Sequence, residues 1–304
     1  MGNIGKKLGY IVAPLLTPFY RDSGEVNYDR AKQLTEHLIS DNLCDSIIVG
    51  GSTGEFSTMS YEERVKMLHT VKEACANRIP LVAGTGAPST REAIALTQEA
   101  EKMGYDAVLV VGPYYCNPTQ EGIYEHFKAI AESTNLPILL YNIPIFTNLN
   151  IKPETVGRLS KIPNIVGIKD EAGLNPTQMT EYRLATYPEF VIYNGDDIMI
   201  LCGLAQGAAG VVSGGAHVIG HIIRKMINAF VDGRIEEAKK IHYEIYPFFK
   251  GVCQNGRINP QPILKEAVAL CGYDLGYARQ PLDHATPEEI EYIRQQLLRL
   301  GVLE

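Results

Sequence analysis

The sequence predicts an α/β fold, a (β/α)8 TIM barrel followed by a C-terminal helical appendage. From about residue 10 to residue 229 one pattern recurs: a short apolar or β-branched run, a turn rich in Gly, Pro, Asn or Ser, and a longer segment with helical periodicity. A helix after each strand returns the chain to the same edge of the sheet, so we expect parallel strands. Eight repeats of near-constant length favour closure into a barrel.

The elements follow this pattern in order. The expected strands are 10–16, 46–49, 80–83, 107–111, 137–141, 165–169, 191–193 and 209–213. Amphipathic helices are expected between them, among others at 28–40, 61–76, 90–103 and 120–133. After residue 233 the strand pattern stops, and helices are expected at about 235–254, 261–271 and 287–300. We therefore expect a barrel domain at 1–232 and a helical region at 233–304.

The competing fold is a doubly wound open sheet. That fold usually carries a glycine-rich dinucleotide fingerprint after its first strand, and this chain has none there. Its 304 residues are compatible with one barrel of about 250 residues plus an appendage. The closed barrel is therefore the prediction.

Composition and charge exclude several classes of partner. The chain is 45% hydrophobic and 21% charged, as in ordinary globular proteins, and its 28 basic and 35 acidic residues give a net charge of −7. It has neither a basic cluster interleaved with aromatics nor an apolar run of about 18–20 residues, so we expect neither nucleic acid nor a membrane as partner. No secretion-type apolar stretch follows Lys6 and Lys7, and the six cysteines lack C-x-x-C spacing. These features predict a cytoplasmic protein with reduced thiols.

One lysine is expected at the functional end of the barrel, where the carboxyl ends of parallel strands meet. Lys169 ends the apolar run 164–168, so its side chain is expected to point into the mouth or the interior. A desolvated lysine favours the neutral amine, which can attack a ketone to form an imine. The alternative is a structural lysine paired with Asp170 or Glu171.

Two further features fit the same chemistry. Tyr141 ends the neighbouring strand, where its phenol could exchange protons with an adduct on Lys169; the alternative is a core tyrosine with a satisfied hydroxyl. The Gly-Ser-Thr-Gly-Glu turn at 51–55 offers successive backbone N–H groups to a small carboxylate. It lacks the Gly-Lys-Ser/Thr ending of a phosphate-binding loop. A 2-oxo acid would suit both features.

A metal-dependent mechanism is the rival. His217 and His221 are four residues apart and could share a helix face, but no carboxylate or third histidine accompanies them. Asp196 and Asp197 lie at a strand-helix junction, where acidic residues more often cap the helix than bind a cation. We therefore expect no metal.

Four motifs, in this order and spacing, resemble those of a known family. They are Gly50–Glu55, Pro113-Tyr114-Tyr115, Tyr141-Asn142-Ile143-Pro144 and Gly167-Ile168-Lys169-Asp170. Together they are similar to the dihydrodipicolinate synthase and N-acetylneuraminate lyase family of class I aldolases, over nearly the whole chain. The resemblance implies a cofactor-free lyase that binds pyruvate as an imine, and homo-oligomers that are usually tetramers, arranged as dimers of dimers.

The resemblance also implies catalytic roles for individual residues. Lys169 matches the Schiff-base lysine, and Tyr141 matches the tyrosine that moves protons during condensation. Ser52 occupies the first hydroxyl position of the turn, which belongs to the proton relay. Tyr115 matches the relay tyrosine that reaches into the neighbouring subunit's site in family dimers.

Substrate-binding roles are implied in the same way. Thr53, at the second hydroxyl position, and Gly51 before it match the turn that holds the substrate carboxylate. Val212 falls where a backbone carbonyl approaches the bound pyruvate.

The aldehyde that reacts with pyruvate is less well indicated. The segments 113–122, 195–197 and 259–262 look closest to the dihydrodipicolinate synthase branch, which implies a 4-hydroxy-tetrahydrodipicolinate synthase activity with aspartate semialdehyde. However, Phe146 stands where that branch usually has an arginine for the carboxylate of the aldehyde. The ending 272–277 looks like 2-keto-3-deoxygluconate aldolases, which gives a second hypothesis. A third is a non-catalytic relative that only binds a 2-oxo acid.

Overall fold

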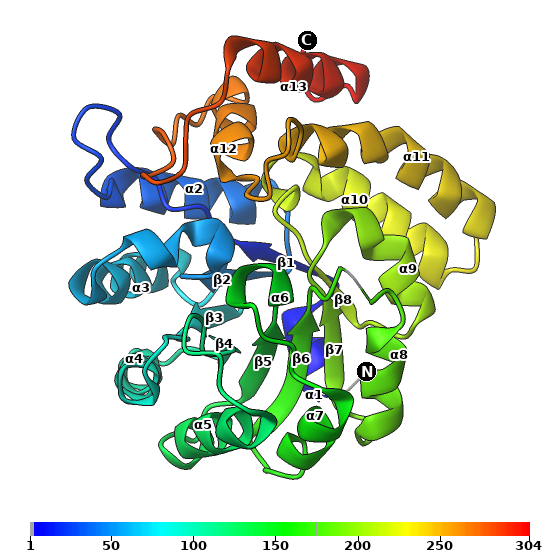
Figure 1. Ribbon diagram of the computed structural model, residues 1–304. Helices are drawn as coiled ribbons and strands as arrows, with labels where there is room; N and C mark the ends of the chain where they lie inside the picture. The colour runs from blue at the N-terminus through cyan, green and yellow to red at the C-terminus, as the bar shows by residue number, and fades with distance from the viewer. Residues whose placement is uncertain (1–2, 174) are drawn as a thin grey trace. The chain divides into compact units, whose positions relative to one another are not determined.

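The computed structural model describes residues 3–173 and 175–304 of the chain. Within these residues eight strands form a closed barrel in the order β1-β2-β3-β4-β5-β6-β7-β8, which confirms the predicted fold class (Figure 1). The strands are β1 (Ile11–Pro14), β2 (Ser46–Val49), β3 (Leu81–Gly84), β4 (Ala107–Val111), β5 (Ile138–Asn142), β6 (Ile165–Asp170), β7 (Val191–Asn194) and β8 (Gly210–Val212). Residues 1, 2 and 174 of the predicted barrel domain lie outside the described residues.

The seven helices whose ranges were predicted, α2 to α5 and α11 to α13, lie within two residues of the predicted ends. The α-helices are α1 (Asn3–Leu8), α2 (Tyr28–Ser40), α3 (Tyr61–Cys75), α4 (Thr90–Lys102), α5 (Gln120–Glu132), α6 (Pro144–Thr147), α7 (Pro153–Leu159), α8 (Gln178–Ala185), α9 (Ile200–Ala205), α10 (Ala216–Val231), α11 (Ile235–Val252), α12 (Gln261–Leu270) and α13 (Pro287–Arg299). The 3-10 helices are η1 (Ser52–Gly54), η2 (Phe56–Thr58) and η3 (Asp197–Met199). None of the described helices combines the length and the apolar character needed to cross a bilayer.

Capping residues explain where several helices begin. Helix α3 starts with a capping box in which Ser60 Oγ accepts from the Glu63 N–H and the Glu63 carboxylate accepts from the Ser60 N–H. Thr286 and Glu289 form the same box before α13. Thr119 caps α5 by accepting from a backbone N–H in the first turn. Each cap satisfies N–H groups that have no partner inside the helix.

The chain divides into two compact units. Unit 1 comprises residues 1–12 and 80–212, and unit 2 comprises residues 13–79 and 213–304. Unit 1 contains β3 to β8, and unit 2 contains β2 and the helices α2, α3 and α10 to α13. The boundary at residues 232 and 233, between a barrel domain and a helical region, stays a prediction.

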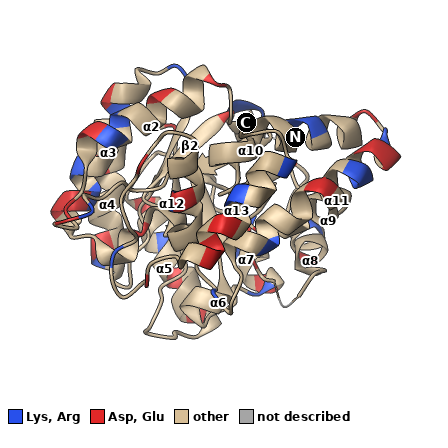
Figure 2. Ribbon diagram, turned by 90° about the horizontal axis from the view of Figure 1, so that it is seen from above, with Lys and Arg blue, Asp and Glu red and all other residues tan. Residues whose placement is uncertain are grey.

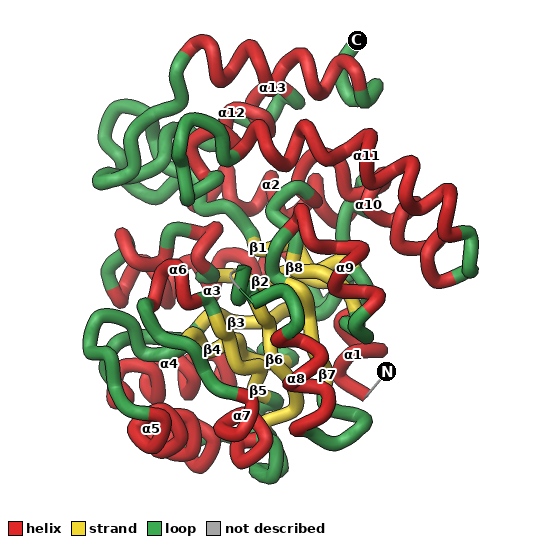
Figure 3. The backbone as a smooth tube through the Cα atoms, turned by 45° about the vertical axis from the view of Figure 1, so that its right-hand side comes forward, coloured by secondary structure: helices red, strands yellow, loops and turns green. Residues whose placement is uncertain are grey.

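In unit 1 the strands from β3 to β8 pair in parallel. Helices α4, α5, α7 and α8 pack in sequence along their outer side (Figure 3). The register places Tyr141, Lys169 and Tyr193 side by side on β5, β6 and β7. Gly167 allows close approach of β6 and β7, since a Cβ there would lie 2.5 Å from the Val191 carbonyl oxygen.

In unit 2, α2 packs on α3, and α11 packs on α10, α12 and α13. Helix α10 passes close to the chain before β2, because a Cβ on Gly220 would lie only 2.1 Å from the Leu43 carbonyl oxygen. Acidic and basic residues are interspersed along α11 and α13 (Figure 2). Helices α11, α12 and α13 correspond to the three helical stretches expected after residue 233, and α10 precedes them.

Candidate active site

Strands β5 and β6 bring Tyr141 and Lys169 together. The two residues are direct neighbours in the parallel register, so their side chains leave the sheet on the same side. Both are buried, and Lys169 Nζ lies 4.0 Å from the centre of the Tyr141 ring, in cation-π contact. The expectation that Lys169 points away from bulk water agrees with its 5% exposure.

A third residue, Glu171, joins this pair. Its Oε2 accepts a hydrogen bond from the Tyr141 hydroxyl at 2.9 Å and lies 3.2 Å from Lys169 Nζ. One carboxylate oxygen therefore contacts both groups. Of the two acids named from the sequence as possible partners of Lys169, the structure pairs the lysine with Glu171.

Asp170 belongs to a different set of contacts. Its Oδ1 accepts hydrogen bonds from Asn142 Nδ2 at 3.0 Å and from Gln178 Nε2 at 3.3 Å. Burial raises the pKa of Asp170 to about 6, although these hydrogen bonds to the carboxylate oppose the shift. Because successive residues of a strand point to opposite faces of the sheet, the side chains of Asp170 and Lys169 lie on different faces.

Gly195, directly after β7, makes room for the lysine. A Cβ at this position would lie 2.6 Å from Lys169 Cε and 3.0 Å from Glu171 Cβ. Any larger residue would displace the lysine stem. Sequence reasoning noted Gly195 only as part of a motif, because a glycine gives no sign of which distant side chain fills the space beside it.

Two other predicted site residues of unit 1 lie apart from these contacts. Val212 ends β8, pairs with Val12 and is buried. Tyr115, in the loop after β4, has a positive φ of 71° and is 96% exposed. The structure of the single chain does not pack Tyr115 against Lys169 and Tyr141.

In unit 2 the hydroxyl turn follows β2. Ser52 and Thr53 are half-buried and begin η1 after the extended residue Gly51. The N–H of Gly54 donates to the Gly51 carbonyl, and a Cβ on Gly54 would lie 2.9 Å from the Leu15 carbonyl oxygen. Glycine is therefore required for the close contact of this turn with the chain after β1.

Helix α12 holds the turn from the other side. Gln261 Nε2 donates to the Ser52 carbonyl at 2.8 Å, and Lys265 Nζ lies 2.6 Å from Glu55 Oε1. Lys265 Nζ also donates to the Tyr277 carbonyl. Burial lowers the pKa of Lys265 to about 8, while the charge of Glu55 opposes the shift. Sequence reasoning missed this pair, because its members are separated by about 200 residues with no shared motif.

His217 and His221, whose spacing would allow them to share a helix face, lie on either side of a kink. Ile219 has non-helical angles inside α10, and the resulting kink separates the buried His217 from the exposed His221. His217 Nε2 accepts from the Leu16 N–H and its Nδ1 donates to the Gly214 carbonyl. Burial lowers the pKa of His217 to about 4. The rival hypothesis of a histidine pair on one helix face is therefore wrong, and His217 is bound by two backbone groups.

The two aspartates after β7, Asp196 and Asp197, lie at the start of η3. Asp196 caps η3 by accepting from the Ile198 N–H, which confirms the capping interpretation for this residue. Among the described residues, no three His, Cys, Asp or Glu side chains converge in the arrangement of a metal site. Asp197 stands next to the cap, within η3.

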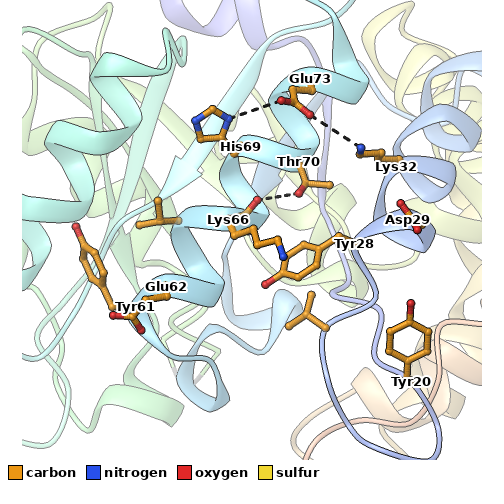
Figure 4. Close-up of a pocket in the computed structure, with 12 residues that line it drawn as sticks. Tyr20, Tyr28, Asp29, Lys32, Tyr61, Glu62, Lys66, His69, Thr70 and Glu73 are labelled. Carbon is orange, nitrogen blue, oxygen red and sulfur yellow. Dashed lines mark hydrogen bonds and ion pairs between the residues drawn. The ribbon is translucent and has the colours of Figure 1, made fainter.

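A surface hollow in unit 2 lies between α2 and α3 (Figure 4). Lys66 Nζ stacks on the Tyr28 ring at 4.1 Å, and Glu73 lies 4.0 Å from both Lys32 and His69. These are solvated pairs on two helices. The hollow contains none of the residues predicted to bind substrate, so we place the candidate site at Lys169.

Comparisons with known proteins agree with this site. A model of the dihydrodipicolinate synthetase family matches residues 7–299. The chain belongs to this family. A 4-hydroxy-tetrahydrodipicolinate synthase of Desulforudis audaxviator (strain MP104C) is 45% identical over 295 residues, which cover 97% of this chain and 98% of that protein.

Solved structures of family members are similar as well. A synthase from Cyanidioschyzon merolae with lysine bound is 39% identical, with a TM-score of 0.92 and coverage of 97% of this chain and 99% of that one. A chloride-inhibited synthase from Acinetobacter baumannii, complexed with pyruvate, is 33% identical, with a TM-score of 0.90 and coverage of 97% and 100%. The predicted family and enzyme class are confirmed, and the relatives favour the synthase hypothesis over the 2-keto-3-deoxy sugar-acid aldolase.

Proposed function

We propose that this chain is a 4-hydroxy-tetrahydrodipicolinate synthase that condenses pyruvate with aspartate semialdehyde through an imine on Lys169. The observation that carries the proposal is the buried lysine at the end of β6, with its amine against the ring of Tyr141. Close relatives named as this synthase and a relative complexed with pyruvate support it. Burial in a barrel mouth is the usual setting for a lysine that reacts as a neutral amine.

The proposed reaction begins at Lys169 Nζ. The neutral amine attacks the keto carbon of pyruvate, a carbon-nitrogen bond forms, and the keto oxygen leaves as water with the two amine hydrogens. The imine nitrogen takes up the phenol proton of Tyr141 to become an iminium, and the phenolate then accepts a proton from the pyruvate methyl group, which leaves an enamine. The enamine carbon attacks the aldehyde carbon, and the aldehyde oxygen takes up a proton to become a hydroxyl. Water or an amino group of the condensed chain then releases Lys169.

Other residues are proposed to hold the substrate and relay protons. Thr53 and the backbone at Gly51 bind the pyruvate carboxylate, in a turn whose position α12 fixes through Gln261. Ser52 relays protons to Tyr141. The backbone carbonyl of Val212 lies against the bound pyruvate.

Tyr115 is proposed to complete the relay in a second subunit. A tyrosine that is 96% exposed on a strained loop is better explained by a partner chain that covers it than by a role in a monomer. We propose a homotetramer built as a dimer of dimers, in the cytoplasm. Sedimentation of the purified protein tests the assembly. Tyr115→Phe is expected to lower turnover without weakening the association of the subunits.

Two measurements test the function. Intact mass after incubation with pyruvate and borohydride is expected to show one reduced adduct, located on Lys169 by peptide mapping. An unmodified lysine would indicate a non-catalytic binder of 2-oxo acids. Steady-state rates with aspartate semialdehyde should exceed those of the reverse cleavage of 2-keto-3-deoxygluconate by more than about tenfold, or roughly 1.4 kcal/mol.

A further inference from the structure

Glu171 is a carboxylate that the proposed reaction has not used. It lies directly after β6, two residues from Lys169, and its side chain is 26% exposed while that of Lys169 is 6% exposed. The acid is therefore more accessible to solvent than the lysine that it contacts. Its Oε2 lies 3.2 Å from Lys169 Nζ and 2.9 Å from the Tyr141 hydroxyl oxygen.

We propose that Glu171 is a further catalytic residue, the general base and acid that carries protons between Lys169 Nζ, Tyr141 and the keto oxygen during imine formation. This assignment rests on the proposed function. Both contacts are within the range for direct proton transfer. One oxygen serves both partners, so a proton taken from the amine can reach the phenol without solvent.

The proton transfers balance around the imine. An ammonium on Lys169 cannot attack, and it first gives one proton to Glu171 Oε2. The neutral amine then bonds to the keto carbon, and the alkoxide formed takes a proton from Tyr141, which Glu171 restores. The nitrogen gives a second proton to Glu171, and the same proton leaves with the hydroxyl group as water. Lysine ammonium and ketone thus become iminium and water, and Glu171 ends as the carboxylate that it was.

The geometry around Glu171 supports a transfer role over a purely structural one. Gly195 leaves space beside both residues, with its hypothetical Cβ 3.0 Å from Glu171 Cβ, so the glutamate is accommodated together with the lysine. Asp170, the adjacent acid, is instead held by two amide donors, Asn142 and Gln178. Glu171 is thus the acid at this strand end whose contacts are with the two reactive side chains.

The test compares the rate of imine formation in wild type and Glu171→Gln, by rapid quenching with pyruvate and borohydride at neutral pH. Gln keeps the shape and can accept from Tyr141, but it cannot take a proton. We expect adduct formation to slow by roughly 100-fold. Glu189→Gln, at an exposed position of the same unit, is the matched control and is expected to react like wild type.

If Glu171 were only a structural partner of Lys169, the substitution would not slow adduct formation. Such a carboxylate only stabilises the ammonium, so Glu171→Gln would leave more neutral amine and react as fast as wild type or faster, and this result would overturn the assignment. A wild type that forms no adduct overturns the proposed function itself. Thermal unfolding checks that the variant folds. As a second variant, Glu171→Ala is expected to recover part of the rate with added formate, and no recovery in a folded protein contradicts the role.

Discussion

Among the described residues, two buried lysines each pair with a glutamate, one pair in each unit, and the pairs differ in how exposed the glutamate is. In unit 2, Lys265 and Glu55 are both almost fully buried and 2.6 Å apart, and further backbone groups bind each of them. In unit 1, Lys169 lies 3.2 Å from Glu171, whose side chain is 26% exposed. Solvent therefore reaches neither member of the first pair, whereas it reaches the carboxylate of the second.

This difference separates a structural lysine from a reactive one. The amine of Lys265 is committed to Glu55 and to the Tyr277 carbonyl, at the base of the turn that carries Ser52 and Thr53. The amine of Lys169 faces an aromatic ring and a solvent-accessible acid, so a small ketone can displace its contacts without exposing an unpaired buried charge. Burial alone therefore does not mark a catalytic lysine.

The largest effect is expected at Lys169. Lys169→Arg keeps the positive charge beside Glu171, but a guanidinium stays protonated and cannot form the imine. Turnover should fall by about 10⁴-fold or more, and the borohydride adduct should disappear from the mass spectrum. Activity within tenfold of wild type would break the comparison, since Lys169 would then be no more reactive than Lys265.

Lys265 should affect stability rather than imine formation. Lys265→Met leaves the Glu55 carboxylate buried without its cation, which should cost about 3–5 kcal/mol of unfolding free energy in a denaturant titration. Lys265→Met combined with Glu55→Gln should recover much of this loss. The exposed Lys239→Met serves as control.

Adduct formation in the Lys265 variants further tests whether Lys265 is structural and Lys169 reactive. Below the denaturant transition, the double variant should still form the pyruvate adduct on Lys169. If the adduct were absent from a folded Lys265 variant, Lys265 would belong to the reactive machinery and the distinction between the pairs would fail.

A pH effect of intermediate size is expected at Asp170. Burial raises the pKa of Asp170 to about 6 in the folded chain, above the ordinary value of about 3.9 for an aspartate, so between these values the folded state binds more protons than the unfolded state. The stabilising contribution of Asp170 is therefore complete below about pH 4 and is lost as pH rises through 6. As the pH rises from 4 to 7, the unfolding free energy of wild type should therefore fall by about 2–3 kcal/mol more than that of Asp170→Asn.

Chemical denaturation at these two pH values provides the measurement for Asp170. The exposed Asp22→Asn should follow wild type at both. Equal pH slopes for wild type and Asp170→Asn would mean that Asp170 is solvated as well as an exposed acid, and that burial at the end of β6 is limited to Lys169.

The smallest effect concerns the aldehyde. Phe146, on the short helix α6 that follows Tyr141, is 38% exposed. Phe146→Arg would supply a bidentate donor and should raise kcat/KM for aspartate semialdehyde by about tenfold, or 1.4 kcal/mol. Ile145→Arg, at the exposed neighbouring position, should leave it unchanged. An equal rise with an aldehyde that lacks a carboxylate would refute the charge argument.

The periodic parts of the fold were predictable from the sequence, and the reason is local. Apolar alternation and turn residues lie within each repeat, so that β2 and β4 were placed with their observed bounds and α2 with both of its ends. Contacts between residues far apart in the chain produce no such local pattern in the sequence. The pairing of Lys265 with Glu55, and the space that Gly195 leaves for Lys169, depend on segments that come together only in the fold.

The sequence by itself determined the barrel, the family and the candidate lysine, because strand ends, motif spacing and a polar residue after an apolar run are all local properties of the chain. Tertiary structure alone decided which acid meets that lysine. Alternate residues of a strand face opposite sides, which turns Asp170 toward Asn142 and Gln178, while the chain after β6 carries Glu171 back to Lys169 and Tyr141. It also decided that His217 and His221 part at a kink, which helical spacing could not indicate.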